Sequence, residues 1–191
     1  MRADAREKRA ALITAAWDLF AVNGPEVPLR TVAAEAGVGI GTLYRHFPTR
    51  DDLVIGLIED MAHRVLEIIH RHTENWDGSE EGWRTFVHEV AALKVAALAE
   101  RTIAVTPVDG RVWIDTEPLR EQFLSAYQGI LQLAAASGFV EPGLSPWRFH
   151  LGLAAVSRPM PEKAEDFAPG QAEWLIDTFI AGLAGSPAPR G

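Results

Sequence analysis

Apolar residues recur at intervals of three and four along almost the whole chain, a spacing typical of amphipathic α-helices. No segment has the alternation of apolar and polar residues that predicts a β-strand. The first helix is expected to begin after Asp4, because Glu7 completes a D-x-x-E capping pattern, and to end at Gly24. Its apolar stripe consists of Leu12, Ile13, Ala16, Trp17, Leu19 and Phe20.

Two short helices are predicted next, over residues 29–36 and 39–47. Pro28 suits the start of the first, since proline lacks the N–H that a first turn leaves unpaired. Gly37 separates the two helices.

A long helix should follow, capped at its beginning by Thr49 and running to about His72. Asp51 and Asp52 lie in its first turn, where the helix macrodipole favours acidic side chains.

The rest of the chain also has helical spacing, with Asp77 and Ser79 as cap candidates before the next helix. Residues 107–113 are expected to be irregular, and 158–170 to be a loop because of three prolines and a glycine. The later helices are predicted over residues 80–104, 116–137, 147–157 and 171–184. We therefore predict an all-α protein with domains at 1–50 and 51–185 and a disordered tail at 186–191.

Composition narrows the class of protein. The 191 residues are 48% hydrophobic and 23% charged, as in a globular protein with a sizeable core. The absence of cysteine excludes disulfides, thiolate metal sites and cysteine nucleophiles. No apolar run approaches the ~20 residues of a membrane span, and the charged N-terminus is not followed by a signal-peptide segment. We expect a cytoplasmic protein without a membrane partner.

Charge is unevenly distributed along the chain. Residues 1–50 contain seven Lys and Arg against five Asp and Glu, a net charge of +2, whereas the remainder contains eleven against twenty-one, a net charge of −10. This asymmetry indicates a polyanionic partner for the N-terminal part alone, although a surplus of +2 is small enough to arise by chance.

The stretch "LRTVAAEAGVGIGTLYRHF" has the pattern of a helix-turn-helix. Ala33 allows a second helix to approach closely, and Gly37, four residues later, can adopt the left-handed conformation that the turn requires. In this motif the second helix enters the DNA major groove. The inward face would consist of Val32, Ala36, Val38, Leu43 and Phe47.

The second of these helices carries groups suited to DNA. Arg45 can bond guanine or phosphate, and Thr42 can offer a hydroxyl to phosphate or a methyl to thymine. Gly39 and Gly41 would let the backbone approach DNA closely. The further candidates for phosphate contacts are Tyr44, His46 and Arg50. The alternative is that Tyr44 and His46 are simply the edge of an amphipathic helix.

The motifs "ALITAAWDLFAVNG", "VAAEAGVGIGTLYRHF" and "PTRDDL" occur in the order and with the gaps of one known family. Residues 9–53 resemble the N-terminal domain of the tetracycline-repressor (TetR) family of transcriptional regulators. The family usually has serine at Gly39 and a Thr or Ser pair at Val27 and Pro28, so this chain lacks one helix cap and one or two phosphate-binding hydroxyls. The resemblance implies that Thr42, Tyr44, His46 and Arg50 contact DNA, with Arg30 and Thr31 as further phosphate candidates.

Beyond residue 51 the chain resembles the family in architecture only. The resemblance implies a small-molecule pocket and a homodimer built from the last two helices. The last helix has a fitting apolar stripe at Ala172, Leu175, Ile176, Phe179, Ile180 and Leu183. Gly152 would allow close approach of the helix before it. The alternative is that both helices belong to the core of a single chain.

The expected pocket is mostly apolar, as small-molecule sites are. Tyr127 and His150 are the polar groups best placed to orient an apolar or aromatic effector, unless they are ordinary core residues. The candidate effector-binding residues are Met61, Val65, Phe86, Val90, Trp113, Phe123, Tyr127 and His150.

Enzymatic and metal sites have little support. The sequence "HEVAA" at His88 lacks the second histidine of a zinc protease, and no G-x-S-x-G motif occurs. One helix face carries His63, Glu67, His70 and Glu74, which could hold a metal, but a solvated charged face is the favoured interpretation. We expect no cofactor, no metal and no enzymatic activity. The predicted function is a ligand-responsive repressor that binds an inverted-repeat operator in double-stranded DNA as a dimer and is released by its effector. The alternatives are an enzyme and a ligand-binding protein without DNA.

Overall fold

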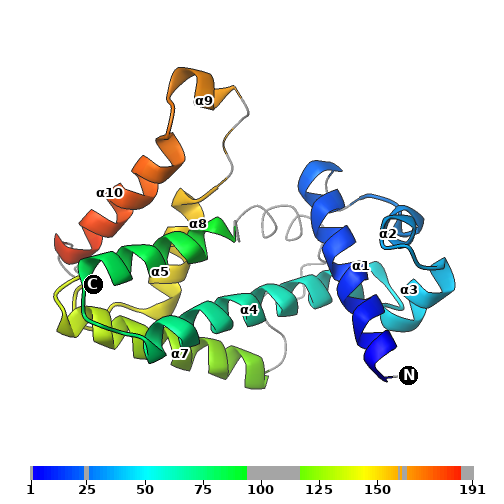
Figure 1. Ribbon diagram of the computed structural model, residues 1–191, viewed down its shortest axis with the longest axis horizontal. Helices are drawn as coiled ribbons and strands as arrows, with labels where there is room; N and C mark the ends of the chain where they lie inside the picture. Colours follow the sequence, from blue (N-terminus) through cyan, green and yellow to red (C-terminus); the bar gives the residue numbers. More distant parts are fainter. Residues whose placement is uncertain (1, 24–25, 94–116, 159, 161–162, 186–191) are drawn as a thin grey trace. The chain divides into compact units, whose positions relative to one another are not determined.

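The computed structural model describes residues 2–23, 26–93, 117–158, 160 and 163–185. All regular secondary structure in these ranges is helical, which confirms the predicted all-α class (Figure 1). The helices are α1 (Arg2–Asn23), α2 (Leu29–Glu35), α3 (Ile40–His46), α4 (Arg50–Glu74), α5 (Glu80–Ala92), α7 (Glu117–Ala136), α8 (Pro146–Val156), α9 (Ala164–Phe167) and α10 (Gln171–Gly185). None of these described helices combines the length and apolar character needed to cross a membrane.

Two compact units divide the described chain within α4, between Ala62 and His63. The first contains α1, α2, α3 and the beginning of α4. The second contains the rest of α4, α5 and the described residues from 118 onward. The expected domain boundary at residue 50 lies earlier, at the start of α4.

In the first unit, α1 packs against α2 and α3 (Figure 1). The predicted stripe of α1 supplies much of this core, with Leu12, Ala16 and Phe20 fully buried. Burying each large apolar side chain contributes about 1.5–3 kcal/mol, so this packing rather than helix propensity fixes the two short helices α2 and α3 against α1. The core is completed by Ile13, Ala15, Val27, Val32, Ala33, Leu43, Phe47, Leu53, Val54 and Leu57.

The predicted beginning of α1 is wrong. Asp4 lies inside the helix and not before it, and its carboxylate pairs with the Lys8 amino group at 2.9 Å. An acidic residue four positions before a lysine stabilises a helix that contains both residues, so the charged N-terminus continues the helix upstream of the expected cap. The end at Asn23 agrees with the prediction.

The predicted cap of α4 is confirmed. The Asp52 backbone N–H donates to the Thr49 hydroxyl at 3.1 Å, and the Thr49 backbone N–H donates to the Asp52 carboxylate at 2.9 Å. This reciprocal pair is a capping box, which satisfies two backbone donors at the start of the helix.

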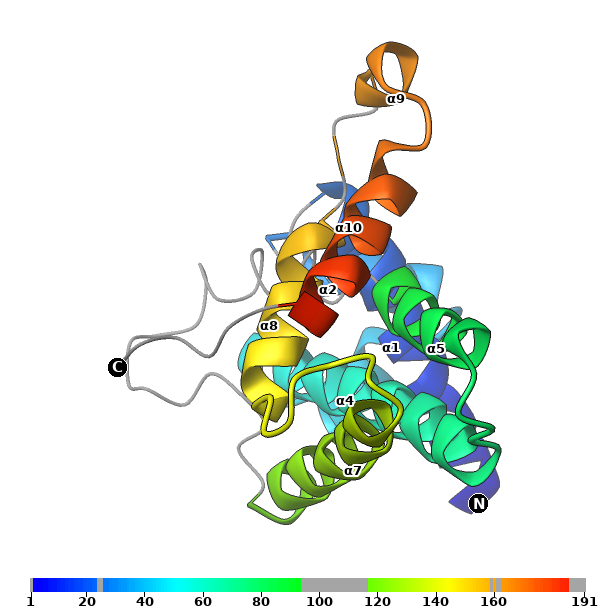
Figure 2. The ribbon, with the colours of Figure 1, turned by 90° about the vertical axis from the view of Figure 1, so that its left-hand side faces the viewer.

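In the second unit, α10 packs against α5 and α8, and these helices lie side by side in Figure 2. Gly152 of α8 makes the expected close approach: a Cβ atom at this position would lie 2.8 Å from the Phe179 ring of α10. The predicted cap of α5 is also confirmed, because the Ser79 hydroxyl accepts the Gly82 N–H at 3.0 Å.

The loop predicted over 158–170 is partly wrong, because Ala164–Phe167 form the short helix α9. These four residues contain no proline, so nothing in their own backbone prevents one helical turn. The predictions for residues 94–104, for the irregular segment at 107–113, for Trp113 and for a disordered tail at 186–191 fall outside the described residues.

Candidate functional site

The turn between α2 and α3 has the geometry that the sequence pattern predicts. Gly37 has a φ of +66°, in the left-handed region that glycine adopts without steric cost. The Gly37 N–H donates to the Ala34 carbonyl at 3.1 Å, and the Val38 N–H donates to the Ala33 carbonyl at 2.9 Å. This pair of bonds is a Schellman motif, which ends α2 abruptly and directs the chain into α3.

Helix α3 has one buried and one exposed face. Leu43 is fully buried, and Phe47, just after the helix, is 2% exposed; both belong to the first unit's core. Next to this buried side, Tyr44 is 50% exposed and Ile40 is 42% exposed. The buried side of the helix is thus held by apolar packing, and the other side is exposed to solvent. Ile40 was missed as a candidate, although its place one turn before Tyr44 was visible in the sequence.

Arg45 is folded back along α3. Its Nε donates to the Gly41 carbonyl at 3.1 Å, and its guanidinium donates to the Thr42 hydroxyl at 3.2 Å. The side chain is exposed, so these bonds hold its charge on the free surface of the helix. Any base contact by Arg45 would exchange them for bonds to DNA. Thr42 is half-buried and Gly41 is exposed, with no atom within 4 Å of a Cβ built there.

Helix α3 begins without a side-chain cap. Gly39 is the N-cap residue of α3 and gives no side-chain hydrogen bond, as expected from the absence of serine at this position. Arg45 and His46 lie in the last turn of α3, where positive charge is favourable to the helix macrodipole.

Arg50 links two parts of the helix-turn-helix. Its guanidinium donates to the Val27 carbonyl at 2.8 Å, and Val27 immediately precedes the cap of α2. This contact joins the start of α4 to the start of α2 across 23 residues of sequence. The candidate phosphate ligand therefore also has a structural role. The remaining candidates Arg30 and Thr31 are exposed on α2.

The predicted effector-binding residues of the second unit gather in an aromatic core. Phe86, Phe123 and Tyr127 are each at most 3% exposed, and Phe123 lies edge-on to the Tyr127 ring at a centroid distance of 4.9 Å. Trp83 and Phe149 extend the same cluster. Val65 is buried here too, and Met61 is buried in the first unit.

Tyr127 and His150 form the polar centre of this core. The Tyr127 hydroxyl lies 2.9 Å from His150 Nδ1. Burial lowers the pKa of His150 to about 4 and raises that of Tyr127 well above its usual value, so both groups are uncharged near neutral pH. If the tyrosine hydroxyl donates to Nδ1, the imidazole carries its proton on Nε2.

Of the candidate effector residues, Val90 and His150 line a common crevice of about 160 Å³, which is too narrow for a water molecule. Leu153, Ala154 and Ser157 of the α8 region complete its wall. The other described candidates are buried side chains. The eight residues thus remain a prediction.

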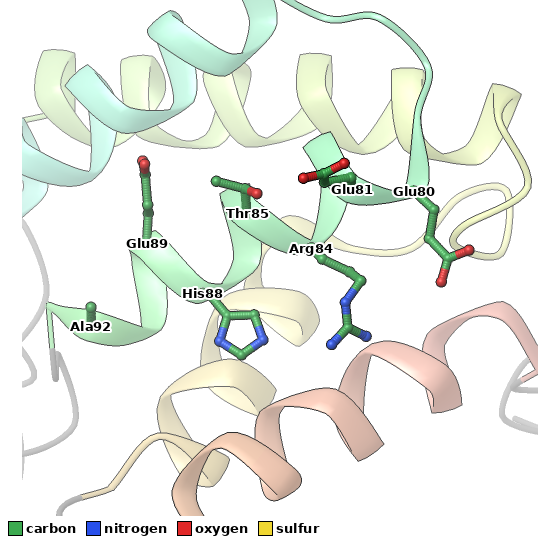
Figure 3. Close-up of a pocket in the computed structure, with 7 residues that line it drawn as sticks. All are labelled: Glu80, Glu81, Arg84, Thr85, His88, Glu89 and Ala92. Carbon is green, nitrogen blue, oxygen red and sulfur yellow. The ribbon is translucent and has the colours of Figure 1, made fainter.

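A second hollow runs along α5 and was not predicted. Its wall consists of Glu80, Glu81, Arg84, Thr85, His88, Glu89 and Ala92. Figure 3 shows the Arg84 and His88 side chains pointing toward α10. Asp177 Oδ1 of α10 lies 2.8 Å from His88 Nε2 and 2.6 Å from Arg84 Nη2. These two hydrogen bonds lower the pKa of Asp177. This polar link joins α5 to α10 beside the apolar contact of Gly152 with Phe179.

The first unit thus contains a helix-turn-helix, formed by α2 and α3, whose second helix has an exposed face. Residues 12–57 match the family model for bacterial regulatory proteins of the tetR family. The helix-turn-helix region of the chain is thus similar to the N-terminal domain of this family.

Known proteins agree with this assignment. A helix-turn-helix-type transcriptional repressor of Mycobacterium tuberculosis is 37% identical over 65 residues, which cover 34% of this chain and 35% of that protein. The match thus spans about a third of the length of this relative. The crystal structure of a TetR transcription regulatory protein from Mycobacterium vanbaalenii is 26% identical with a TM-score of 0.66, covering 95% of this chain and 98% of that one.

A third similar structure has a bound ligand. The TetR-like regulator LfrR from Mycobacterium smegmatis, solved in complex with proflavine, matches with a TM-score of 0.67 and 20% identity over 97% of this chain and 99% of that one. At this identity the similarity establishes the common fold only.

Proposed function

We propose that the protein is a transcriptional regulator that binds double-stranded operator DNA through α3 and represses transcription. The observation that carries this proposal is the two-sided burial of α3. Leu43 anchors the helix in the core, while Tyr44 and Arg45 remain exposed on the opposite surface. A helix that is packed against the core on one side and exposed on the other can enter the major groove without unfolding the domain.

The expected contacts divide into two kinds. Arg30, Thr31, Tyr44, His46 and Arg50 are suited to phosphates, which set affinity and register. Thr42 and Arg45 are suited to base edges, which set sequence preference. Gly41 leaves room for the DNA backbone because no side chain projects there.

Selection from a randomised duplex library by the full-length protein tests this proposal. The selected sequence should then be shifted in a gel by the wild type, and Tyr44→Ala and Arg45→Ala should bind it more weakly. Arg120→Ala in α7 is the matched control, because it also removes one exposed arginine but lies in the second unit. Failure of the library to yield any enriched sequence would reject DNA recognition.

A homodimer follows from the same mechanism, because one recognition helix covers too few base pairs for selectivity and a two-fold dimer reads an inverted repeat. The α8–α10 pair offers a surface for it. Leu151 is 49% exposed and Trp174 is 59% exposed, although most of the predicted stripe of α10 is packed within the chain. The exposed residues of this surface are Leu151, Ala155, Trp174, Thr178 and Ala181.

Release by a small apolar or aromatic effector completes the proposal. The effector would enter the aromatic core beside Tyr127 and His150, where the crevice at Val90 is the existing starting point. Both polar groups are uncharged there, so a neutral ligand with one hydrogen-bonding group fits better than an ion. Helix α4 contributes to both compact units and provides a continuous element through which the ligand can act on the recognition domain.

Proflavine is a suitable first probe of this step because it binds the structurally similar LfrR. Its fluorescence would be titrated with the protein in the presence and absence of the selected DNA. Coupling of about 1–3 kcal/mol would appear as a 5- to 150-fold difference in affinity, and linkage requires the same factor for DNA. Equal affinities would reject coupling for this ligand and leave the DNA-binding proposal intact.

A further inference from the structure

Ile40 is a large apolar side chain that folding leaves in water. It is the first residue of α3 and is 42% exposed. Its neighbours in sequence are Gly39 and Gly41, and no other atom lies within 4 Å of a Cβ built at either. Ile40 is therefore the only one of residues 39–41 that carries a side chain.

The surroundings of Ile40 match a nucleic-acid surface better than a protein interface. Tyr44, one turn later on the same face, is 50% exposed and carries a hydroxyl. The Arg45 side chain is hydrogen-bonded to the Gly41 carbonyl and the Thr42 hydroxyl of the same helix. A basic group, two hydroxyls and one isolated apolar side chain provide phosphate, base-edge and methyl contacts together.

An isoleucine has no hydrogen-bonding atom in its side chain, so it can recognise a base only through apolar contact. Among the base-pair edges of the major groove, thymine alone presents an apolar group, its C5-methyl. A β-branched side chain also has few rotamers in a helix, which fixes the direction of the contact. We infer that Ile40 makes the operator specific for a thymine in each half-site by packing against that methyl group.

This inference rests on the proposed function, and its test separates the two. The full-length protein would first select its sites from a randomised duplex library. Each thymine of the selected half-site would then be replaced in turn by deoxyuridine, which removes the methyl and keeps every hydrogen-bonding group. At one thymine, affinity should fall about fourfold per half-site, the factor expected for one methyl group.

The protein variant supplies the second half of the test. Ile40→Ala should select sites without the thymine preference and bind thymine and deoxyuridine sites equally. Ile55→Ala is the matched control, because Ile55 is a similarly exposed isoleucine, 39% exposed, on α4. It should retain both the preference and the sensitivity to deoxyuridine.

The outcomes are distinct. Specific binding that no deoxyuridine replacement weakens would overturn the role of Ile40 and leave DNA binding standing. Sensitivity that persists in Ile40→Ala would assign the methyl contact to another residue, with Thr42 the first to examine. A library that yields no enriched sequence would instead reject the proposed function. The replacement changes the DNA and not the protein, so the first result does not depend on how any variant folds.

Discussion

The Tyr127 hydroxyl and His150 Nδ1, 2.9 Å apart, are a hydrogen-bonded pair enclosed by aromatic rings. Phe123 and Trp147 both lie edge-on to the His150 ring, at centroid distances of 5.1 and 6.2 Å. Burial at 4% exposure disfavours the imidazolium, which is why the pKa of His150 falls to about 4. A group that stays neutral when folded and gains a proton when unfolded makes stability depend on pH.

The first prediction follows from the sign of this shift. The unfolded chain, with an ordinary histidine pKa of 6.5, binds a proton below that pH, while folded His150 binds it only near pH 4. Stability contributed by His150 is therefore complete above pH 6.5 and is lost as the pH falls toward 4, by roughly 3 kcal/mol in total. Urea unfolding of the wild type and His150→Phe at several pH values should show a flatter profile for the variant over this range.

The exposed His63 provides the control for that comparison. His63→Phe exchanges an exposed histidine for the same residue and shows what the substitution itself does to the profile. Identical profiles for the wild type and His150→Phe would mean that His150 does not titrate as its burial requires.

A second prediction concerns the hydrogen bond itself. Tyr127→Phe keeps the ring and removes the hydroxyl, which leaves His150 Nδ1 without its partner in the core. A buried unsatisfied acceptor costs about 1–3 kcal/mol. Urea unfolding at pH 7.5 should show this loss. An unchanged free energy of unfolding in Tyr127→Phe would mean that the hydrogen bond contributes no net stability.

A third prediction concerns the contact between α8 and α10. In Gly152→Ala, the new methyl would lie 2.8 Å from the Phe179 ring, and overpacking of this kind costs about 1–3 kcal/mol. Gly129→Ala in α7 is the matched control, because no atom lies within 4 Å there. That control should gain up to about 1 kcal/mol from helix propensity. A stabilised Gly152→Ala would show that the two helices separate more easily than their packing indicates.

Local chemistry made much of the fold predictable from sequence. The caps at Thr49 and Ser79 and the turn at Gly37 depend on residues within four positions of one another, so short motifs identify them. The capping pattern at Asp4 failed because the same acid also suits an i,i+4 pair with Lys8, and the pattern alone does not choose between the two.

Contacts between distant residues were not predictable in the same way. The bond from Arg50 to Val27 spans a turn and two helices, and nothing in either residue's neighbours specifies it. The sequence predicted a close approach at Gly152, but it did not indicate that Phe179 is the contacting residue. The apolar stripe of α10 likewise could not reveal that Phe179 faces α8 inside the chain while Trp174 faces water. Most of the candidate effector residues were recognised as apolar, but the sequence did not indicate that Phe86, Phe123 and Tyr127 belong to one cluster of aromatic rings.

A fourth prediction distinguishes Arg30, on α2, from Arg50, at the start of α4. Arg30→Ala removes an exposed charge, so it should weaken DNA binding and reduce the salt slope by about 0.9 for a lost phosphate contact, with stability unchanged. Arg50→Ala also removes the bond to the Val27 carbonyl and should lower the free energy of unfolding by about 1–3 kcal/mol. Gel shifts at several salt concentrations and thermal unfolding measure the two effects. Equal stability for both variants would mean that the Arg50 contact contributes nothing to the fold.

The last prediction concerns the dimer surface on α8 and α10. Trp174 is 59% exposed in the single chain, so Trp174→Glu should leave the fold intact and place a charge in the proposed interface. If each Trp174 contributes about 2 kcal/mol, a two-fold contact containing both loses about 4 kcal/mol, a thousandfold weaker association. Light scattering should then show a monomer, and affinity for an inverted-repeat site should fall with it. Ile55→Glu adds the same charge at an exposed residue of α4 and should remain dimeric.

Phe179→Glu is not a suitable test of the dimer interface. Phe179 packs against Gly152 and Phe149 of its own chain, so a charge there would unfold the protein. A folded Trp174→Glu that is still a dimer would move the interface away from this surface.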